Sequence, residues 1–198
     1  MMRLVHLGDL DVALPLAAAL TAWLLAACAW RTALRWGLCF AAAVLLVGGS
    51  KIAFLGWGTG FSALAFKVLS GHATMVSALY PMLAWVLLCR QGSAAQRIGL
   101  AAGLALGAAV AVLLVMEGEH TGTESAGGWL LGAGVSLAGV ACSSDLRTAR
   151  LLAGLWWSLP VFAVGAWLME SAHVGYWMVR LALALSGNSH PHAWDACG

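Results

Sequence analysis

The sequence predicts an all-α protein, a polytopic membrane bundle of six transmembrane helices, or seven if the segment 173–185 also crosses. Of its 198 residues, 62% are hydrophobic and only 9% are charged, which is more apolar than the core of a soluble domain of this size requires. The apolar residues fall in runs close to the roughly 20 residues that a membrane-spanning helix needs. We expect a single domain over 1–186, followed by a short turn-rich tail over 187–198.

Six apolar runs are long enough to cross, at 12–30, 37–54, 71–89, 98–116, 124–142 and 151–168. The glycine-rich stretch 56–60 ends the second run because such spacing favours turns. Residues 61–69 are then too few to cross and are expected to lie at the interface. Pro160 predicts a kink in the sixth run. The run 173–185 carries Arg180 and is short, so it is either a tilted seventh span or a helix lying at the interface.

The arginines predict which connections of the bundle face the cytoplasm. They fall in alternate connections, namely Arg31, Arg35, Arg90, Arg97, Arg147 and Arg150. By the positive-inside rule these connections face the cytoplasm. Lys51 and the polar segments 66–74 and 117–124 then share the opposite side, which is the periplasmic face if the protein lies in a bacterial inner membrane. The net charge of +2 and the absence of a basic stripe with interleaved aromatics give no indication of nucleic-acid binding.

The first polar segment has the composition of an anion site. Ser70 can cap the helix that follows, and Gly71 lets backbone N–H groups approach a ligand closely. A helix N-terminus with free N–H groups binds anions, and Lys51 and Lys67 add positive charge that suits phosphate. The alternative is that Ser70 is only a cap and His72 only an interfacial histidine.

The second polar segment places His120 four residues before Glu124, so both side chains lie on one face if the helix begins near His120. The carboxylate can then hold the imidazole in one tautomer and raise the basicity of its other nitrogen. The alternative is that Thr121 and Glu124 form a capping box, in which the carboxylate only satisfies the start of the helix. Both arrangements can hold at once.

Taken together, Lys51, Ser70-Gly71-His72 and His120-x-x-x-Glu124 resemble the type-2 phosphatidic acid phosphatase superfamily, which also contains the vanadium haloperoxidases. The resemblance covers about residues 45–140. It implies a lipid phosphatase that needs neither metal nor cofactor, with His120 as the nucleophile that becomes a phosphohistidine. It also implies that Glu124 replaces the family aspartate and that His72 is the general acid. Ser70, Gly71 and Lys51 would bind phosphate oxygens.

The chain departs from the family pattern at three places. Gly58-Thr59 stands where the family has Arg-Pro, Leu113-Leu114 where it has Ser-Arg, and Leu69 where it has proline. Two arginines that would clamp phosphate are therefore absent, and lysine cannot reproduce their bidentate contacts. Lys67 and Arg180 are the candidates to replace them, although an arginine on a short helix also commonly extends to the interface.

Three other functions remain open at this stage. The missing arginines favour a catalytically weakened relative that binds or senses a lipid phosphate head group. A proton-linked transporter would use the His120 and Glu124 pair, but the ionisable groups gather at one interface instead of the membrane midplane. A metal-dependent hydrolase would use Glu119, His120 and His72, whose spacing is not specific for a metal.

Overall fold

The computed structural model describes residues 2–146 and 148–193, and its regular structure is helical throughout, which confirms the predicted all-α class. The helices are α1 (Met2–Val5), α2 (Leu10–Ala26), α3 (Trp30–Trp57), α4 (Gly71–Leu87), α5 (Ser93–Met116), α6 (Gly122–Ala141), α7 (Thr148–Ala172) and α8 (Val174–Ser186). Short 3-10 turns follow α1 and precede α4 and α7. An isolated bridge between Phe61 and Phe66 closes the loop before α4.

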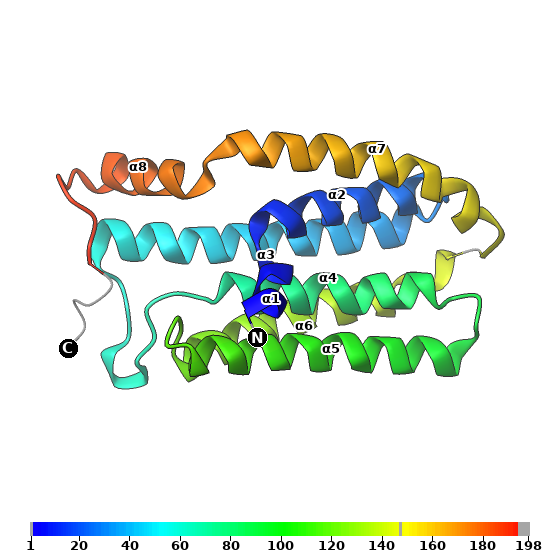
Figure 1. Cartoon of the computed structure of the whole chain (residues 1–198), viewed down its shortest axis with the longest axis horizontal. Coiled ribbons are helices and arrows are strands. Elements are labelled where there is room, and N and C mark those ends of the chain that lie inside the picture. The colour runs from blue at the N-terminus through cyan, green and yellow to red at the C-terminus, as the bar shows by residue number, and fades with distance from the viewer. Residues whose placement is uncertain (1, 147, 194–198) are drawn as a thin grey trace.

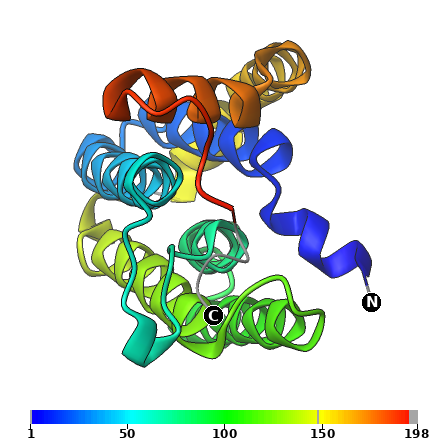
Figure 2. The ribbon, with the colours of Figure 1, turned by 90° about the vertical axis from the view of Figure 1, so that its left-hand side faces the viewer.

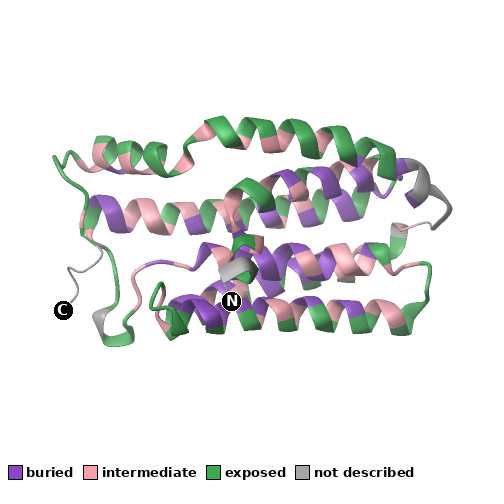
Figure 3. Cartoon of the chain, in the orientation of Figure 1, coloured by how far each residue is buried: buried purple, intermediate pink, exposed green. Residues whose placement is uncertain are grey.

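The long helices lie side by side, and successive helices from α3 to α7 run in opposite directions (Figure 1). Helix α4 lies in the middle of the bundle when it is viewed from one end (Figure 2). It packs against α5 and α6, while α2 packs against α7 and α8 lies along α3. Residues 73–79 of α4 are all buried (Figure 3). The start of α4 is therefore held by neighbours on several sides.

The alternating directions place the connections at two ends of the bundle. The loop 58–70 and the loop 117–121 lie at one end, and the connections 27–29 and 88–92 lie at the other (Figure 1). The predicted gathering of the two polar segments at one end is confirmed by this arrangement. Of the arginines that predicted the sidedness, Arg147 lies outside the described residues.

Of the described helices, α3 and α5 are long and apolar enough to cross a membrane by length and composition. Much of the apolar surface is not buried (Figure 3). Helix α7 alone exposes the large side chains Leu155, Trp156, Trp157, Leu159, Val164, Trp167 and Leu168.

Several predicted boundaries differ from the structure. Helix α3 begins at Trp30, seven residues before the predicted start of the run, and so includes Arg31 and Arg35. Helix α7 contains Pro160 and ends at Ala172, four residues beyond the predicted end of the sixth run at 168. The 13 residues of α8 rise only about 20 Å, which is less than the hydrocarbon thickness, so this helix alone is too short for a seventh span. His173, with a φ of 44°, separates it from α7.

Glycines allow α4 to approach its neighbours closely. A Cβ atom at Gly103 of α5 would lie 2.6 Å from the Cα of Pro81, and one at Gly128 of α6 would lie 2.5 Å from the carbonyl oxygen of Ser70. Both distances are shorter than real side chains allow. The small-residue patterns at 99–107 and 128–132 therefore serve packing within the chain, as such patterns do between membrane helices.

Gly132 and Gly134 provide a test of this packing. A Cβ at Gly132 would collide with the carbonyl oxygen of Thr74 and with Ser77, whereas a Cβ at Gly134 meets nothing within 4 Å. We expect Gly132→Ala to lower the free energy of unfolding by about 1–3 kcal/mol, because the helices must separate. Gly134→Ala should be neutral or stabilise the helix by up to about 1 kcal/mol. Thermal unfolding in detergent measures both, and equal midpoints for the two variants would contradict the packing described.

Candidate functional site

Glu124 begins α6 with a complete capping box. Its carboxylate oxygen Oε2 accepts the N–H of Thr121 at 3.1 Å, and the Thr121 hydroxyl accepts the N–H of Glu124 at 3.4 Å. The capping interpretation of this pair is therefore confirmed. It accounts for the position of Glu124 in the third residue of the helix, where backbone donors would otherwise lack partners.

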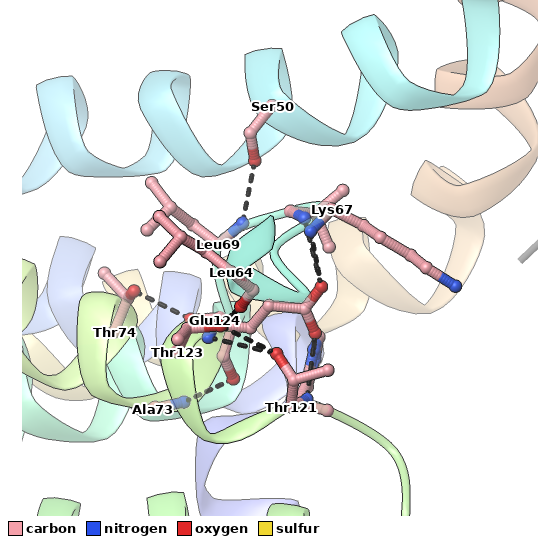
Figure 4. A network of polar contacts seen from close by, with 12 residues as sticks. Ser50, Leu64, Lys67, Leu69, Ala73, Thr74, Thr121, Thr123 and Glu124 are labelled. Carbon is pink, nitrogen blue, oxygen red and sulfur yellow. Dashed lines mark hydrogen bonds and ion pairs between the residues drawn. The ribbon is translucent and has the colours of Figure 1, made fainter. Parts of the chain in front are cut away.

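The same carboxylate also holds the loop that leads into α4. Its second oxygen, Oε1, accepts the backbone N–H of Lys67 at 2.8 Å and of Val68 at 3.3 Å (Figure 4). The backbone carbonyl of Glu124 accepts the N–H of Ser70 at 3.3 Å. Glu124 is only 4% exposed, and a buried carboxylate is stable in such a place only when its oxygens are hydrogen-bonded in this way. One side chain thus ties the first polar segment to the second.

His120 completes the hydrogen bonds of this carboxylate. Its Nδ1 lies 3.0 Å from Oε2 of Glu124, and its side chain is 14% exposed. A carboxylate only accepts hydrogen bonds, so Nδ1 carries the proton and Nε2 keeps its lone pair in the neutral ring. Nε2 has no hydrogen-bond partner among the residues that the structure describes. The predicted pairing of the two side chains is confirmed, and it leaves Nε2 as the ring nitrogen with a free lone pair.

Helix α4 begins with a capped N-terminus beside Lys51. The hydroxyl of Ser70 accepts the N–H of Ala73 at 3.5 Å and is fully buried, so the cap interpretation of Ser70 is confirmed. A contact between Ser70 and substrate oxygens stays a prediction. Gly71 follows, and the Nζ of Lys51 lies 3.7 Å from the place that a Gly71 Cβ would occupy. The amine and the start of α4 are therefore adjacent, as predicted.

A cleft of about 850 Å³ opens beside this helix start, between α2, α3 and the junction of α7 with α8. Its lining includes the ionisable or polar side chains Asp9, Asp11, Lys51, His72, Glu170, His173 and Tyr176, together with aliphatic residues and methionines. The Nε2 of His72 lies 2.9 Å from Oδ1 of Asp9. Reasoning from the sequence missed Asp9, because nothing in its local pattern connects it with a histidine 63 residues further on.

Not all the predicted site residues meet in this cleft. Lys51, Gly71 and His72 line it, whereas His120, Glu124, Lys67 and Arg180 do not. The Lys67 side chain extends away from the Glu124 carboxylate (Figure 4). Arg180 lies 5.7 Å above the ring of Tyr176 and donates to its hydroxyl at 3.0 Å.

The predicted residues therefore form two groups, His120 with Glu124 and Lys51 with Gly71 and His72, joined through the loop that ends at Ser70. No group of three or more histidine, cysteine or acidic side chains is placed to hold a metal ion within 2–146 and 148–193.

Comparison with known proteins adds one relative. A protein of Klebsiella pneumoniae described as "Uncharacterized 22.5 kDa protein in cps region" is 35% identical over 127 residues. The match covers 64% of this chain and 61% of the relative, so the chain spans less than two thirds of that protein's length. No family model matches the sequence, and no solved structure matches it.

Glu124→Gln tests whether the carboxylate joins the two polar segments. A glutamine offers one acceptor oxygen and one NH₂ donor, so two of the N–H groups now bonded to Glu124 would face a donor. We expect faster backbone hydrogen exchange at residues 66–70 and 120–124, by about tenfold if a net hydrogen bond of roughly 1.4 kcal/mol is lost. Glu119→Gln, at an exposed position, is the matched control. Unchanged exchange at 66–70 in the Glu124 variant would show that the loop is held by other contacts.

Proposed function

We propose that the chain is a membrane-bound phosphatase that hydrolyses a lipid phosphate or diphosphate through a phosphohistidine at His120, without a metal. The observation that carries the proposal is the Glu124 carboxylate, which orients the His120 ring and also holds the segment that begins α4. Lys51 and His72 lie at that helix start. The resemblance of these residues to the type-2 phosphatidic acid phosphatases supports the same assignment.

The proposal includes a membrane setting. Beyond α3 and α5, we assign α2, α4, α6 and α7 as further spans, which makes six. The exposed apolar side chains of α7 and α3 support this, because lipid would cover surfaces that water does not solvate well. The arginine-bearing end would face the cytoplasm and the two polar segments the periplasm of a bacterial inner membrane.

In the proposed site the phosphate lies over the start of α4. The N–H groups of the first turn and the helix dipole attract an anion, and the missing side chain of Gly71 leaves room for it beside the amine of Lys51. Lys67 and Arg180 are the candidates for the two missing arginine contacts, but neither lines the cleft, so each would have to reach the phosphate from outside its lining. His120 does not line the cleft, so the proposal requires a phosphate at the cleft rim that Nε2 can approach.

The reaction would proceed in two balanced steps. The lone pair of His120 Nε2 forms a bond to phosphorus while the bond from phosphorus to the leaving oxygen breaks, and His72 gives that oxygen a proton. Water then attacks phosphorus, its proton passes to His72, and the bond to Nε2 breaks with return of the electron pair. The products are the lipid alcohol, or the lipid monophosphate, and inorganic phosphate. The glutamate stabilises the imidazolium that forms in the first step.

One alternative has structural support, namely a relative that binds a lipid phosphate head group without turnover. Gly58, where the family has arginine, has a φ of 64°, and a Cβ there would lie 2.8 Å from the ring of His192. Leu114, at the second arginine position, is 1% exposed in the core. Neither position could take an arginine without rearrangement, so other side chains would have to supply the two contacts that the resemblance implies.

Phosphate release distinguishes these functions. Detergent-purified protein would be assayed with phosphatidate, phosphatidylglycerophosphate and a polyprenyl diphosphate, with EDTA present. We expect release from at least one lipid and a loss of more than about 10³-fold in His120→Ala, as the loss of a nucleophile causes. His190→Ala, in the exposed segment after α8, is the control and should keep full activity.

Each other outcome has a definite meaning. Equal activity in His120→Ala would rule out this nucleophile. Lipid phosphate binding without release, retained in His120→Ala, would identify a head-group binder. Vanadate, which mimics a five-coordinate phosphorus, should inhibit the phosphatase.

A further inference from the structure

We infer that Asp9 is a positioning residue that holds the ring of His72 in place. His72 is the proton donor of the reaction. The inference rests on the proposed function, because it gives His72 the role of general acid. It adds a residue from the N-terminal segment to the proposed site.

The contact itself has the geometry of an oriented imidazole. Oδ1 of Asp9 lies 2.9 Å from Nε2 of His72, and Oδ2 of Asp9 lies 2.8 Å from Nδ1 of His6. Since a carboxylate only accepts, Nε2 of His72 carries a proton. Its Nδ1 has no hydrogen-bond partner within the described part of the chain and is the nitrogen available to a leaving group. The His72 side chain is 32% exposed, so a substrate can reach it.

The N-terminal segment is packed so that Asp9 stays beside His72. A Cβ at Gly8 would lie 2.7 Å from the Cα of His72 and 2.8 Å from its carbonyl oxygen, so only glycine allows this approach. The hydroxyl of Tyr80, further along α4, donates to the carbonyl of Leu7 at 3.2 Å. These two contacts hold the residues just before Asp9 against α4.

Apart from its contacts with His72 and His6, the Asp9 carboxylate has no hydrogen-bond partner in the described structure. It occupies the N-cap of α2, but its side chain makes no hydrogen bond to that helix. A residue chosen for capping would bond the N–H groups of the first turn. Here the carboxylate points to two imidazoles instead, so its replacement should not remove a cap.

The Asp9 carboxylate is the charged group that lies directly against the His72 ring in the cleft. The groups that share the cleft are Asp9 and Asp11 from the start of α2, Lys51 from α3, and Glu170, His173 and Tyr176 from the junction of α7 with α8. When His72 carries two protons, the negative charge of Asp9 lies against its Nε2–H. In the first step Nδ1–H passes its proton to the leaving oxygen as the bond to phosphorus breaks, and the electron pair of that bond stays on the oxygen. The Nε2 proton stays on the ring throughout, hydrogen-bonded to the Asp9 carboxylate.

A change of leaving group separates this role from a structural one. The value of kcat/KM would be measured for a short-chain phosphatidate, whose alkoxide needs a proton to leave, and for 2,4-dinitrophenyl phosphate, whose phenolate does not. We expect Asp9→Ala to lower kcat/KM at least about tenfold with the phosphatidate, as part of the roughly 10²–10⁴-fold that a general acid supplies. With the dinitrophenyl ester the loss should stay within about twofold. Asp9→Asn, which keeps an acceptor without the charge, should lie between, and His72→Ala should show the same selectivity more strongly.

Asp11→Asn is the matched control, because it removes the same charge from the same cleft without a bond to His72. Its effect should be equal for both substrates. An equal loss with both substrates in Asp9→Ala, or no loss with the phosphatidate, would overturn the inference. The proposed function would still stand in that case if the His120→Ala variant is inactive. If the unchanged chain releases phosphate neither from the dinitrophenyl ester nor from any of the three lipids named above, the proposed function itself falls.

A readout that needs no turnover completes the test. In ¹⁵N spectra of the histidine rings, Asp9→Ala should shift the Nε2 signal of His72, since the ring loses the acceptor that holds its proton there. Unchanged His72 signals would overturn the inference whatever the activity.

Discussion

The rest of the site depends on the hydrogen bonds that the Glu124 carboxylate accepts. This carboxylate accepts hydrogen bonds from His120, from the N–H of Thr121, and from the N–H groups of Lys67 and Val68. It is therefore a helix cap, a clamp on the loop before α4 and the partner of an imidazole at the same time. The capping and chemical interpretations of this residue describe one arrangement, and removing the carboxylate would disturb both.

Helix α4, whose preceding loop is bonded to Glu124, is itself packed tightly by its neighbours. Glycines of α5 and α6 lie against it so closely that side chains in their place would collide with its backbone. The N-terminus of α4 is thus fixed where Lys51, the cleft and the Glu124 loop meet. A preorganised start of a helix suits anion binding, because little reorganisation is needed when the ligand arrives.

Features that depend on neighbouring residues were predictable from the sequence. The apolar runs predicted the helices α4 to α6 to within a few residues, and the four-residue spacing predicted the pairing of His120 with Glu124. Contacts between distant segments were not predictable. Asp9 reaches His72 across 63 residues, and Arg180 stacks on Tyr176 instead of entering the cleft. Local pattern carries no information on which segments pack together.

Trapping the covalent intermediate tests the central claim most directly. The protein would be mixed with ³²P-labelled phosphatidate, quenched in alkali within the first turnover, and digested for mass spectrometry, since a bond from nitrogen to phosphorus survives alkali. The account predicts a phosphoryl group on the peptide that contains His120, lost in His120→Ala. Phosphate release with no labelled protein, or a label on another residue, would contradict the assignment of His120 as the nucleophile that Glu124 orients.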